Sequence, residues 1–543
     1  MRLNWKLKTV GLVGAISLIL AGCSSAIGGM DHSKMNMGNE EEKPSQSTEK
    51  QTGIAQTAEW NILTGKEFNL TAVASNQEIA PGKTLPVWTF NNSVPGPELR
   101  VKQGDTVKIN LRNELPDPVT IHWHGVPVPN EMDGIPGVTQ NAVQPGESFT
   151  YQFQATVPGT YWYHSHQDGV NQLDRGLYGS FIVEGDDVQK VDRDYTLLLD
   201  EWMSSGMDMS QGASSDMDMD MSGMDHSGMD MGDSNMDMED SNMDMGGMEM
   251  DMAHDMSMYD LYTINGKSGD LVKPLVVKEG EKVRIRLVNA GYLSHQIHLH
   301  GHDFKITATD GQPLNNPGVV TDNVVTLAPG ERYDLEFEAT NPGKWLIEDH
   351  GDNNAVKGMK AWIAYEGSTE QTDKANEKEM LGSVDLTSYG QLGKASLSLD
   401  QSYTMEYTMN LNTESKKGET VYTINGKTFP ETEPLPVKKG DTVKVRLVNQ
   451  SKSDDHPMHL HGHFFQVLSK NGKPLEGSPI IKDTINVKPG EEYVIAFIAD
   501  NEGNWMFHCH DLHHASAGMV TEVKYSDYKT DFVADPNAGN KPE

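Results

Sequence analysis

Cysteine is scarce in this chain: Cys23 and Cys509 are the two cysteines among 543 residues. This scarcity excludes a fold that depends on several disulfide bonds for its stability. A chain of this length buries enough apolar surface to fold without them. Long apolar runs are also rare, because beyond residues 10–20 none reaches the roughly 18 residues that a membrane-spanning helix needs. Basic residues are few: 44 Lys and Arg stand against 79 Asp and Glu, a net charge of −35, so we expect no nucleic-acid partner.

The N-terminus has the composition of an export signal. Basic residues precede the apolar run at residues 10–20, and small residues lead to Cys23. This order is typical of a secretory signal, so we expect export, with residues 1–22 removed and residues 23–54 forming a flexible polar tether. The ending Leu-Ala-Gly-Cys resembles a bacterial lipoprotein signal, which implies lipidation of Cys23 and anchoring to the outer face of the cell membrane. A plain cleaved signal is the alternative.

A ten-residue segment occurs three times and predicts the domain organisation. The copies begin Gly-Asp-Thr-Val, Gly-Glu-Lys-Val and Gly-Asp-Thr-Val and cover residues 104–113, 280–289 and 440–449. Each is followed by a Pro-Gly-Glu turn, and the alternating β-branched residues predict short strands with tight turns. The copies lie too far apart for a solenoid, so we expect three whole all-β sandwich domains. Their predicted extents are residues 55–188, 189–366 and 367–543.

The second cysteine stands among other metal-binding side chains. His508, Cys509 and His510 are consecutive, and His514 and Met519 follow closely. A thiolate with two imidazoles and a weak axial thioether is the ligand set of a blue-copper site. In an extended chain successive side chains alternate, so Cys509 is expected to point away from His508 and His510. One tripeptide then reaches two metal centres, and the second imidazole of the blue site must come from elsewhere.

Histidines also recur in His-x-His pairs. The four pairs are His122 and His124, His164 and His166, His459 and His461, and His508 and His510. A lone pair is compatible with a polar surface strand, but four pairs and a cysteine point to metal. A structural zinc site needs only four ligands, so zinc alone does not account for them. His456, just before the third pair, is a source for the missing imidazole of the blue site.

In order, the motifs HWHG, HSH, HPxHLHG and HCHxxxHxxxxM resemble those of the three-domain multicopper oxidases, the family of laccases and bacterial copper-efflux (cuprous) oxidases. The resemblance implies three tandem cupredoxin-like Greek-key domains and four copper ions. The implied type 1 copper ligands are His456, Cys509 and His514, with Met519 axial. The implied type 2 ligands are His122 and His459. The implied ligands of the type 3 pair are His124, His164, His166, His461, His508 and His510.

The same resemblance implies the chemistry. A one-electron donor is oxidised at the type 1 copper, through an exposed edge of His456 or His514, and O2 is reduced to water by four electrons. The implied electron path runs from the Cys509 thiolate to His508 and His510.

Proton delivery is less well defined by the sequence. Asp133 occupies a position where the family keeps a carboxylate near the type 2 copper, and a turn residue before Gly134 is the alternative. Where many bacterial members have a glutamate just after the last type 1 histidine, this chain has Ala515, which leaves the proton route on that side open, with Asp511 as one candidate.

The middle domain keeps histidines but lacks a thiolate. Residues 295–302 parallel residues 456–463. At the positions equivalent to His508 and Cys509, this domain has Glu348 and Asp349. Without a thiolate no blue-copper centre forms, so we interpret this domain as a decayed duplicate. The alternative is a labile copper site at His295, His298 and His300.

A methionine-rich segment, predicted as an insert over residues 203–258, interrupts the middle domain. Residues 207–258 contain seventeen methionines and fourteen acidic residues, with no Lys or Arg. Thioethers are soft ligands that select Cu(I), and the copper-efflux branch carries similar inserts; a neutral linker is the alternative. Asp454 and Asp455, just before His456, are candidates to receive the ion, or form an acidic turn.

Three functions follow from these features: a Cu(I) oxidase for copper tolerance, a laccase acting on phenols, and a surface protein that sequesters copper. A complete ligand set favours an enzyme, and the insert favours Cu(I). We expect O2 and either Cu(I) or a small organic donor as partners, membrane contact through the lipid anchor alone, and a monomer.

Overall fold

The computed structural model describes residues 61–186, 190–205, 258–351, 358–368, 372 and 381–542. The predicted signal with Cys23, the tether and nearly all of the predicted insert lie outside these residues. The described chain is built of strands, with two short α-helices, α1 (Gly169–Asp174) and α2 (Leu512–Ser516), and three 3-10 turns, η1 (Asn130–Met132), η5 (Gly269–Leu271) and η6 (Leu386–Ser388). In the part of the chain described, no helix has the length and apolar character needed to cross a membrane.

Each copy of the repeated segment forms a strand inside a sheet, as predicted. These strands are β5 (Thr106–Asn113), β13 (Lys282–Asn289) and β25 (Thr442–Asn449). Each has one parallel and one antiparallel neighbour, because the same topology recurs three times. The asparagine that ends each copy donates from Nδ2 to a carbonyl oxygen on the opposite sheet or its loop, at Val143, Leu327 and Val487.

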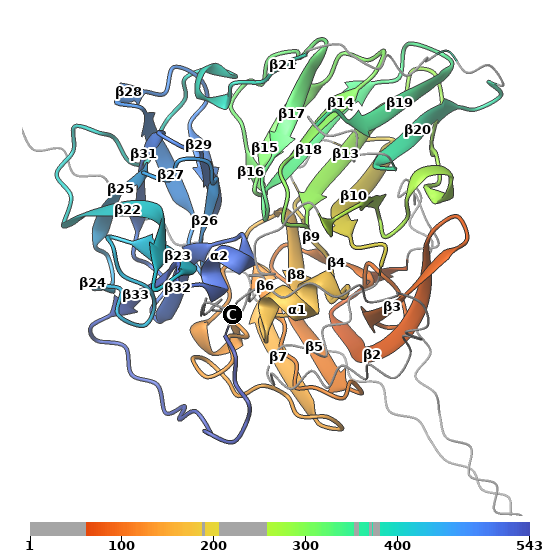
Figure 1. The fold of residues 1–543 in the computed structure, drawn as a ribbon. Helices are drawn as coiled ribbons and strands as arrows, with labels where there is room; N and C mark the ends of the chain where they lie inside the picture. Colours follow the sequence, from red (N-terminus) through yellow and green to blue (C-terminus); the bar gives the residue numbers. More distant parts are fainter. Residues whose placement is uncertain are drawn as a thin grey trace, which may run out of the picture. The chain divides into compact units, whose positions relative to one another are not determined.

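The first pair of sheets supplies the first two His-x-His pairs (Figure 1, red to yellow). One sheet has the order β1 (Ile62–Thr64), β4 (Glu98–Lys102), β9 (Tyr178–Glu184), β8 (Gly159–His164) and β6 (His122–His124). The other has the order β3 (Lys83–Phe90), β2 (Glu67–Ala80), β5 and β7 (Ser148–Gln154). Side chains from both sheets, among them Leu70, Ile109, Trp123 and Phe181, fill one core.

The second pair of sheets carries the predicted insert between two neighbouring strands. One sheet has the order β11 (Leu261–Ile264), β10 (Arg193–Trp202), β13, β18 (Arg332–Glu338), β15 (Lys305–Thr309) and β16 (Gln312–Pro313). The other has the order β12 (Leu275–Val277), β20 (Lys360–Tyr365), β19 (Lys344–Asp349), β14 (His295–Leu299), β17 (Asn323–Leu327) and β21 (Gly382–Ser383). Strands β10 and β11 are antiparallel, with Trp202 opposite Leu261, so the insert replaces the turn of a hairpin.

The third pair of sheets carries the cysteine and the later histidines (Figure 1, blue). One sheet has the order β23 (Glu419–Ile424), β22 (Met405–Lys416), β25, β31 (Glu492–Ile498), β27 (Phe465–Lys470) and β28 (Lys473–Pro474), with β29 (Ile480–Lys482) also on β27. The other has the order β24 (Leu435–Val437), β33 (Val520–Tyr525), β32 (Asn504–Cys509), β26 (His456–Leu460) and β30 (Thr484–Val487). One continuous core cluster joins the second and third pairs of sheets. The all-β prediction is confirmed.

Candidate metal centres

A buried thiol and two imidazoles meet at the end of β32. The Sγ atom of Cys509 lies 3.5 Å from Nδ1 of His514 and 3.9 Å from Nδ1 of His456. The two Nδ1 atoms are 3.3 Å apart. Strand pairing of β26 with β32 and the short helix α2 bring these residues together. Met519 is fully buried, and its carbonyl accepts a hydrogen bond from the Cys509 amide.

The outer nitrogen of each imidazole is held by a polar side chain. His456 Nε2 lies 2.7 Å from Ser451 Oγ, and His514 Nε2 lies 3.3 Å from a carboxylate oxygen of Asp511. Asp511 also caps α2 by accepting hydrogen bonds from backbone amides. Such partners fix the ring orientation and leave Nδ1 of each ring facing the cysteine. His456 is fully buried whereas His514 is 8% exposed, so of the two predicted entry edges only that of His514 reaches the surface.

Eight further imidazoles form one buried cluster between the first and third pairs of sheets, which we call the eight-imidazole cluster. Its members are His122, His124, His164, His166, His459, His461, His508 and His510. Nitrogens of His122, His459 and His461 lie within 4.8 Å of one another, and so do those of His166, His461 and His508. His508 and His510 therefore face this cluster while Cys509 faces the other way, which is the alternation that the sequence predicted.

One nitrogen of most of these rings is held from outside the cluster. Nδ1 of His164 and of His508 lies 2.9 Å from a backbone carbonyl oxygen. Nδ1 of His459 lies 3.1 Å from the Asp483 carbonyl oxygen and 3.1 Å from Thr484 Oγ1. This arrangement selects one tautomer and aims the other nitrogen into the cluster.

The inward-facing nitrogens make the cluster suitable for metal. Several buried ring nitrogens have no hydrogen-bond partner: Nε2 of His122, His164 and His459, Nδ1 of His124, and both nitrogens of His510. Buried polar atoms without partners are costly, and a bound metal ion supplies the missing interaction. Burial lowers the pKa of His124, His164, His461, His508 and His510, so these rings stay neutral, the form that ligates metal.

Asp133 bridges two imidazoles of the cluster that come from distant parts of the chain. One carboxylate oxygen lies 3.2 Å from Nδ1 of His122, and the other lies 3.0 Å from Nδ1 of His461. The side chain is almost completely buried. Asp133 is therefore more than a turn residue before Gly134, because it orients one imidazole of the first domain and one of the third.

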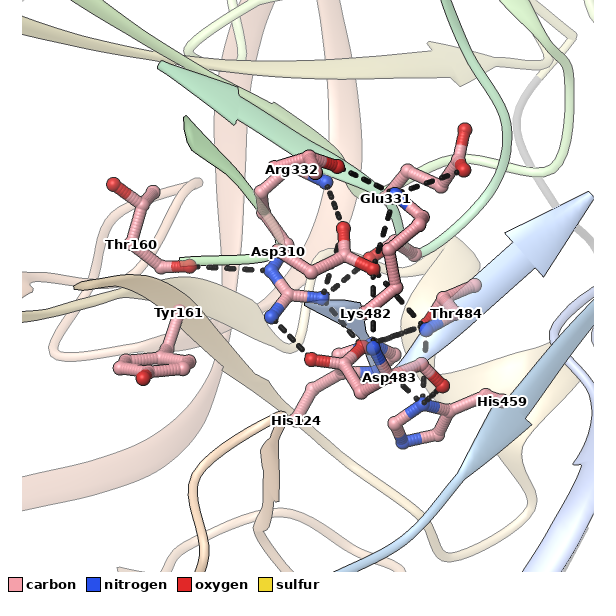
Figure 2. Close-up of polar contacts among 12 residues, drawn as sticks. His124, Thr160, Tyr161, Asp310, Glu331, Arg332, His459, Lys482, Asp483 and Thr484 are labelled. Carbon is pink, nitrogen blue, oxygen red and sulfur yellow. Dashed lines mark hydrogen bonds and ion pairs between the residues drawn. The ribbon is translucent and has the colours of Figure 1, made fainter. Parts of the chain in front are cut away.

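A second buried carboxylate, Asp483, lies beside two other imidazoles of the cluster (Figure 2). It lies 3.2 Å from Nε2 of His124 and 3.5 Å from Nδ1 of His459. The guanidinium of Arg332, from the second domain, donates to both its oxygens at 2.7 and 2.6 Å. Neither residue is exposed, so this bidentate pair is fully desolvated and stabilises the ionised carboxylate.

The second domain adds further contacts to this network. Asp310 accepts hydrogen bonds from the backbone amides of Asp483 and Thr484, and forms an ion pair with Lys482 at 3.2 Å (Figure 2). Close approach also explains one glycine of the HWHG motif. A Cβ at Gly125, where φ is +78°, would meet Arg332 Nη2 and Asp483 Oδ2 at 2.4 Å. The second domain therefore positions residues that contact the cluster, but it contributes no imidazole to the cluster.

The end of the described chain also reaches the cluster. The carbonyl oxygen of Pro542 accepts a hydrogen bond from Nδ1 of His166. Gln167 donates to the Gly539 carbonyl oxygen at 2.8 Å and accepts from the Lys541 amide at 2.9 Å. Residues 539–542 thus hold one imidazole from the side. Neither this contact nor the Asp483 network was predicted from the sequence, where no motif marks them.

Substitution of Asp483 by Asn should impair the cluster while leaving the blue site intact. The amide cannot accept two charge-assisted bonds from Arg332 and no longer orients His124 and His459. Losing an outer partner of a metal ligand typically costs 10–100-fold in metal affinity or activity, so we expect kcat to fall by about that factor. Copper content and the type 2 electron paramagnetic resonance (EPR) signal should fall, with blue absorption unchanged.

Asp194 supplies a matched control for this experiment. Its carboxylate also receives two bonds from a buried arginine, Arg286, at 2.8 and 2.9 Å, but it contacts no imidazole of the cluster. Breaking either buried pair should cost about 3–5 kcal/mol of stability. Only Asp483→Asn should lower the type 2 signal; an equal loss in Asp194→Asn would mean that the network acts through stability alone.

The position corresponding to the blue site in the second domain holds a salt bridge. His295 Nδ1 lies 2.8 Å from Asp349 Oδ2, and its Nε2 lies 3.2 Å from Glu201 Oε2. Burial alone would lower the pKa of His295, but these hydrogen bonds raise it to about 10, so an imidazolium takes the place of the metal. Because carboxylates hold both its nitrogens, the predicted labile site that combined His295 with His298 and His300 is wrong for His295.

A chain with three two-sheet domains, a buried group of one thiol and two imidazoles, and an eight-imidazole cluster has the fold and side chains of a copper oxidase. Comparisons with known proteins agree. Family models described as multicopper oxidase match residues 72–188, 237–368 and 397–529. Multicopper oxidase MmcO of Mycobacterium tuberculosis is 31% identical over 454 residues, which cover 82% of this chain and 84% of that protein. Copper resistance protein A homolog of Pseudomonas syringae pv. tomato is 24% identical, with 85% and 92% covered.

Solved structures give the same answer. The crystal structure of a multi-copper oxidase from Pseudomonas thermotolerans has a TM-score of 0.61 and 26% identity, covering 86% of this chain and all of that one. The chain therefore belongs to the multicopper oxidase family. Its domains are cupredoxin-like, its cofactor is copper, and it is an oxidoreductase with O2 as acceptor, as the sequence predicted.

Proposed function

We propose that this oxidase takes its electrons from Cu(I) and thereby contributes to copper tolerance. The observation that carries the proposal is where the methionine-rich insert leaves and re-enters the fold. Trp202 and Tyr259, which flank it, pack in one core cluster with Leu512 of α2, the helix that carries His514. The insert is therefore attached beside the one blue-site imidazole that reaches the surface.

Charges of both signs lie around α2. Burial alone would lower the pKa of His513, but the nearby carboxylates of Asp511, Asp174 and Glu201 raise it. The ring of His513 contacts that of Tyr292 from the second domain, with centroids 4.7 Å apart. A protonated His513 offsets negative charge at this edge, so the soft thioethers of the attached insert, and not the charge around α2, favour Cu(I) as the donor.

Asp454 and Asp455 contribute less to this argument. Asp454 accepts a hydrogen bond from Thr413 at 2.6 Å, and Asp455 accepts one from Asn486 at 2.8 Å. Both partners belong to the same domain, which favours the acidic-turn interpretation of the pair. We therefore place the approach of the ion at α2.

For the metal sites we assign the ligands in accordance with the geometry. His456, Cys509, His514 and Met519 would hold the type 1 copper, and His122 and His459 the type 2 copper. His124, His164, His166, His461, His508 and His510 would hold the type 3 pair. Bound copper supplies one-electron redox chemistry, which lets single-electron donors reduce O2 to water.

The protein's own residues contribute connection, orientation and protons. Cys509 lies between His508 and His510 in the chain, so covalent bonds join the two sites directly. Asp133 and Asp483 fix ring orientations, and we assign the Asp133 carboxylate to hold the protons that O2 reduction consumes. We also propose that the enzyme acts outside the cell, anchored through a lipid on Cys23, where it would meet incoming copper.

Removal of the insert tests the proposal. Ser204 donates to both oxygens of Asp260 at 2.6 Å, so the ends of the insert already lie together and a short Gly-Ser linker can replace residues 207–257. We expect kcat/KM for Cu(I) to fall by about tenfold or more, as lost ion capture and steering predict. With a bulky phenol, kcat/KM should stay unchanged or rise, because the insert would no longer cover the donor edge.

Two further variants separate the contributions of the insert. Replacing its methionines by leucine removes the soft ligands, and replacing its aspartates by asparagine removes the charge; only the second effect should weaken as salt rises. Proportional losses with both donors would show a role in folding. No change with either would leave a neutral linker and favour a laccase, and Cu(I) binding without O2 uptake would favour sequestration.

A further inference from the structure

The second domain holds a group of metal-binding side chains that the oxidase sites do not include. His298 lies in β14 and His300 just after it; Glu348 lies near the end of β19 and His350 just after that strand. Nitrogens of the three imidazoles lie within 4.8 Å of one another. A carboxylate oxygen of Glu348 lies 3.2 Å from Nε2 of His300 and 3.6 Å from Nε2 of His350.

We propose that His298, His300, His350 and Glu348 form an additional metal site that binds one divalent transition-metal ion, Cu(II) by preference. This site is separate from the coppers of the oxidase, and it does not depend on Cu(I) being the donor. Three imidazoles and one carboxylate suit borderline ions such as Cu(II) and Zn(II), and Cu(II) stands above Zn(II) in the order of affinities.

His295 and His298, which lie on different faces of β14, differ in their hydrogen bonding, and this difference identifies which of them is available to bind a metal ion. At the position equivalent to the blue site, both nitrogens of His295 are held by carboxylates, so the hydrogen-bonding capacity of that ring is already satisfied without metal. At His298, which is 5% exposed, neither Nδ1 nor Nε2 has a hydrogen-bond partner. Leaving such buried atoms unsatisfied costs about 1–3 kcal/mol each, and a metal ion removes part of that cost.

Strand register places these side chains where the third domain has ligands. His298 lies opposite Glu348 on β14 and β19, as His459 lies opposite His508 on β26 and β32. In the third domain that face is completed by imidazoles of the first domain. In the second domain the carboxylate of Glu348 takes the place of one imidazole, and one ion is enough to satisfy the group.

The site is also accessible from solvent. The side chains of His300, Glu348 and His350 are 11%, 18% and 16% exposed, whereas those of the eight-imidazole cluster are buried. An ion can therefore enter a folded and copper-loaded enzyme. The carboxylate also offsets one of the two positive charges that the ion brings.

Zinc counting on the intact holoenzyme tests the proposal. The protein keeps its resident oxidase coppers, is first cleared of copper at the solvent-accessible additional site by brief treatment with a chelator, and is then equilibrated against Zn(II); bound zinc is measured by mass spectrometry. We expect the wild type to bind one more Zn(II) per chain than H350Q, with Cu(II) displacing that ion. Zinc bound by the insert does not affect the difference between the two proteins, because both contain the insert. Unchanged copper content and blue absorption in H350Q establish that it is folded.

Two glutamine variants sharpen the result. Glu348→Gln keeps the shape but removes the charge, and should weaken Zn(II) by about tenfold or more, while Glu338→Gln, at an exposed position on β18, should not change affinity. Equal zinc in the wild type and H350Q would overturn the site. Equal weakening by both glutamine variants would also overturn it, and failure of Cu(II) to displace Zn(II) would overturn the preference for copper.

Discussion

Replacement of Cys509 by Ser is expected to abolish the blue absorption and all turnover. Cys509 supplies the one thiol among the described residues, and its Sγ faces Nδ1 of both His456 and His514. A neutral hydroxyl does not replace the thiolate that a blue-copper site requires. The eight-imidazole cluster should still bind copper, because none of its nitrogens comes from Cys509. Visible and EPR spectra, together with O2 uptake, measure these effects; a variant that stays blue contradicts the assignment.

Met519→Leu is the matched control for that substitution. Leucine is close in volume to methionine, and the backbone bond from the Cys509 amide to the carbonyl of residue 519 remains. The protein should stay blue, and the potential of the blue site should rise because a weak axial donor is lost. A lowered potential would argue against an axial position for Met519.

Local motifs account for what the sequence predicted well. The repeated strand segments set the three domains because alternating apolar residues and turn residues act locally. The opposite orientations of Cys509 and His508 follow from strand geometry alone. For the same reason the cluster was foreseeable as a set of imidazoles, although its assembly depends on contacts between residues far apart in the chain.

The partners that orient the ligands were not foreseeable. Nothing adjacent in sequence links Asp483 to Arg332, and their pairing exists only because the second and third domains pack together. The Pro542 carbonyl that holds His166 belongs to a segment without a motif. A backbone carbonyl has no sequence pattern, so such a contact follows only from the fold.

The second domain shows both successes and limits of comparing repeats. Alignment of the repeats identified Asp349 as the replacement of the thiolate, but it did not reveal that Glu201, from another strand, completes the salt bridge at His295. Nor did it separate His295 from His298, which strand geometry places on different faces of β14. Only the three-dimensional structure therefore shows that carboxylates hold the ring of His295 on one face, while the ring nitrogens of His298 on the other face have no hydrogen-bond partner.

His459→Ala should stop O2 reduction while the blue absorption persists. Nε2 of His459 points into the cluster without a hydrogen-bond partner, and its ring stacks on that of His124 with centroids 3.7 Å apart. Its loss removes a nitrogen that no neighbour replaces, so the type 2 EPR signal should disappear. Stopped-flow reduction of the blue site should remain, because none of that site's side chains is changed: they lie at the start of β26, at the end of β32, in α2 and just after it.

The matched change is His298→Ala, at the equivalent register position of the second domain. Its imidazole lies outside the eight-imidazole cluster, and an ion bound there takes no part in O2 reduction. We therefore expect O2 uptake and the type 2 signal to persist in His298→Ala and to vanish in His459→Ala, although each variant loses one buried imidazole. Equal losses of O2 uptake would mean that the second domain shares directly in the reaction, and a surviving type 2 signal in His459→Ala would refute its assignment.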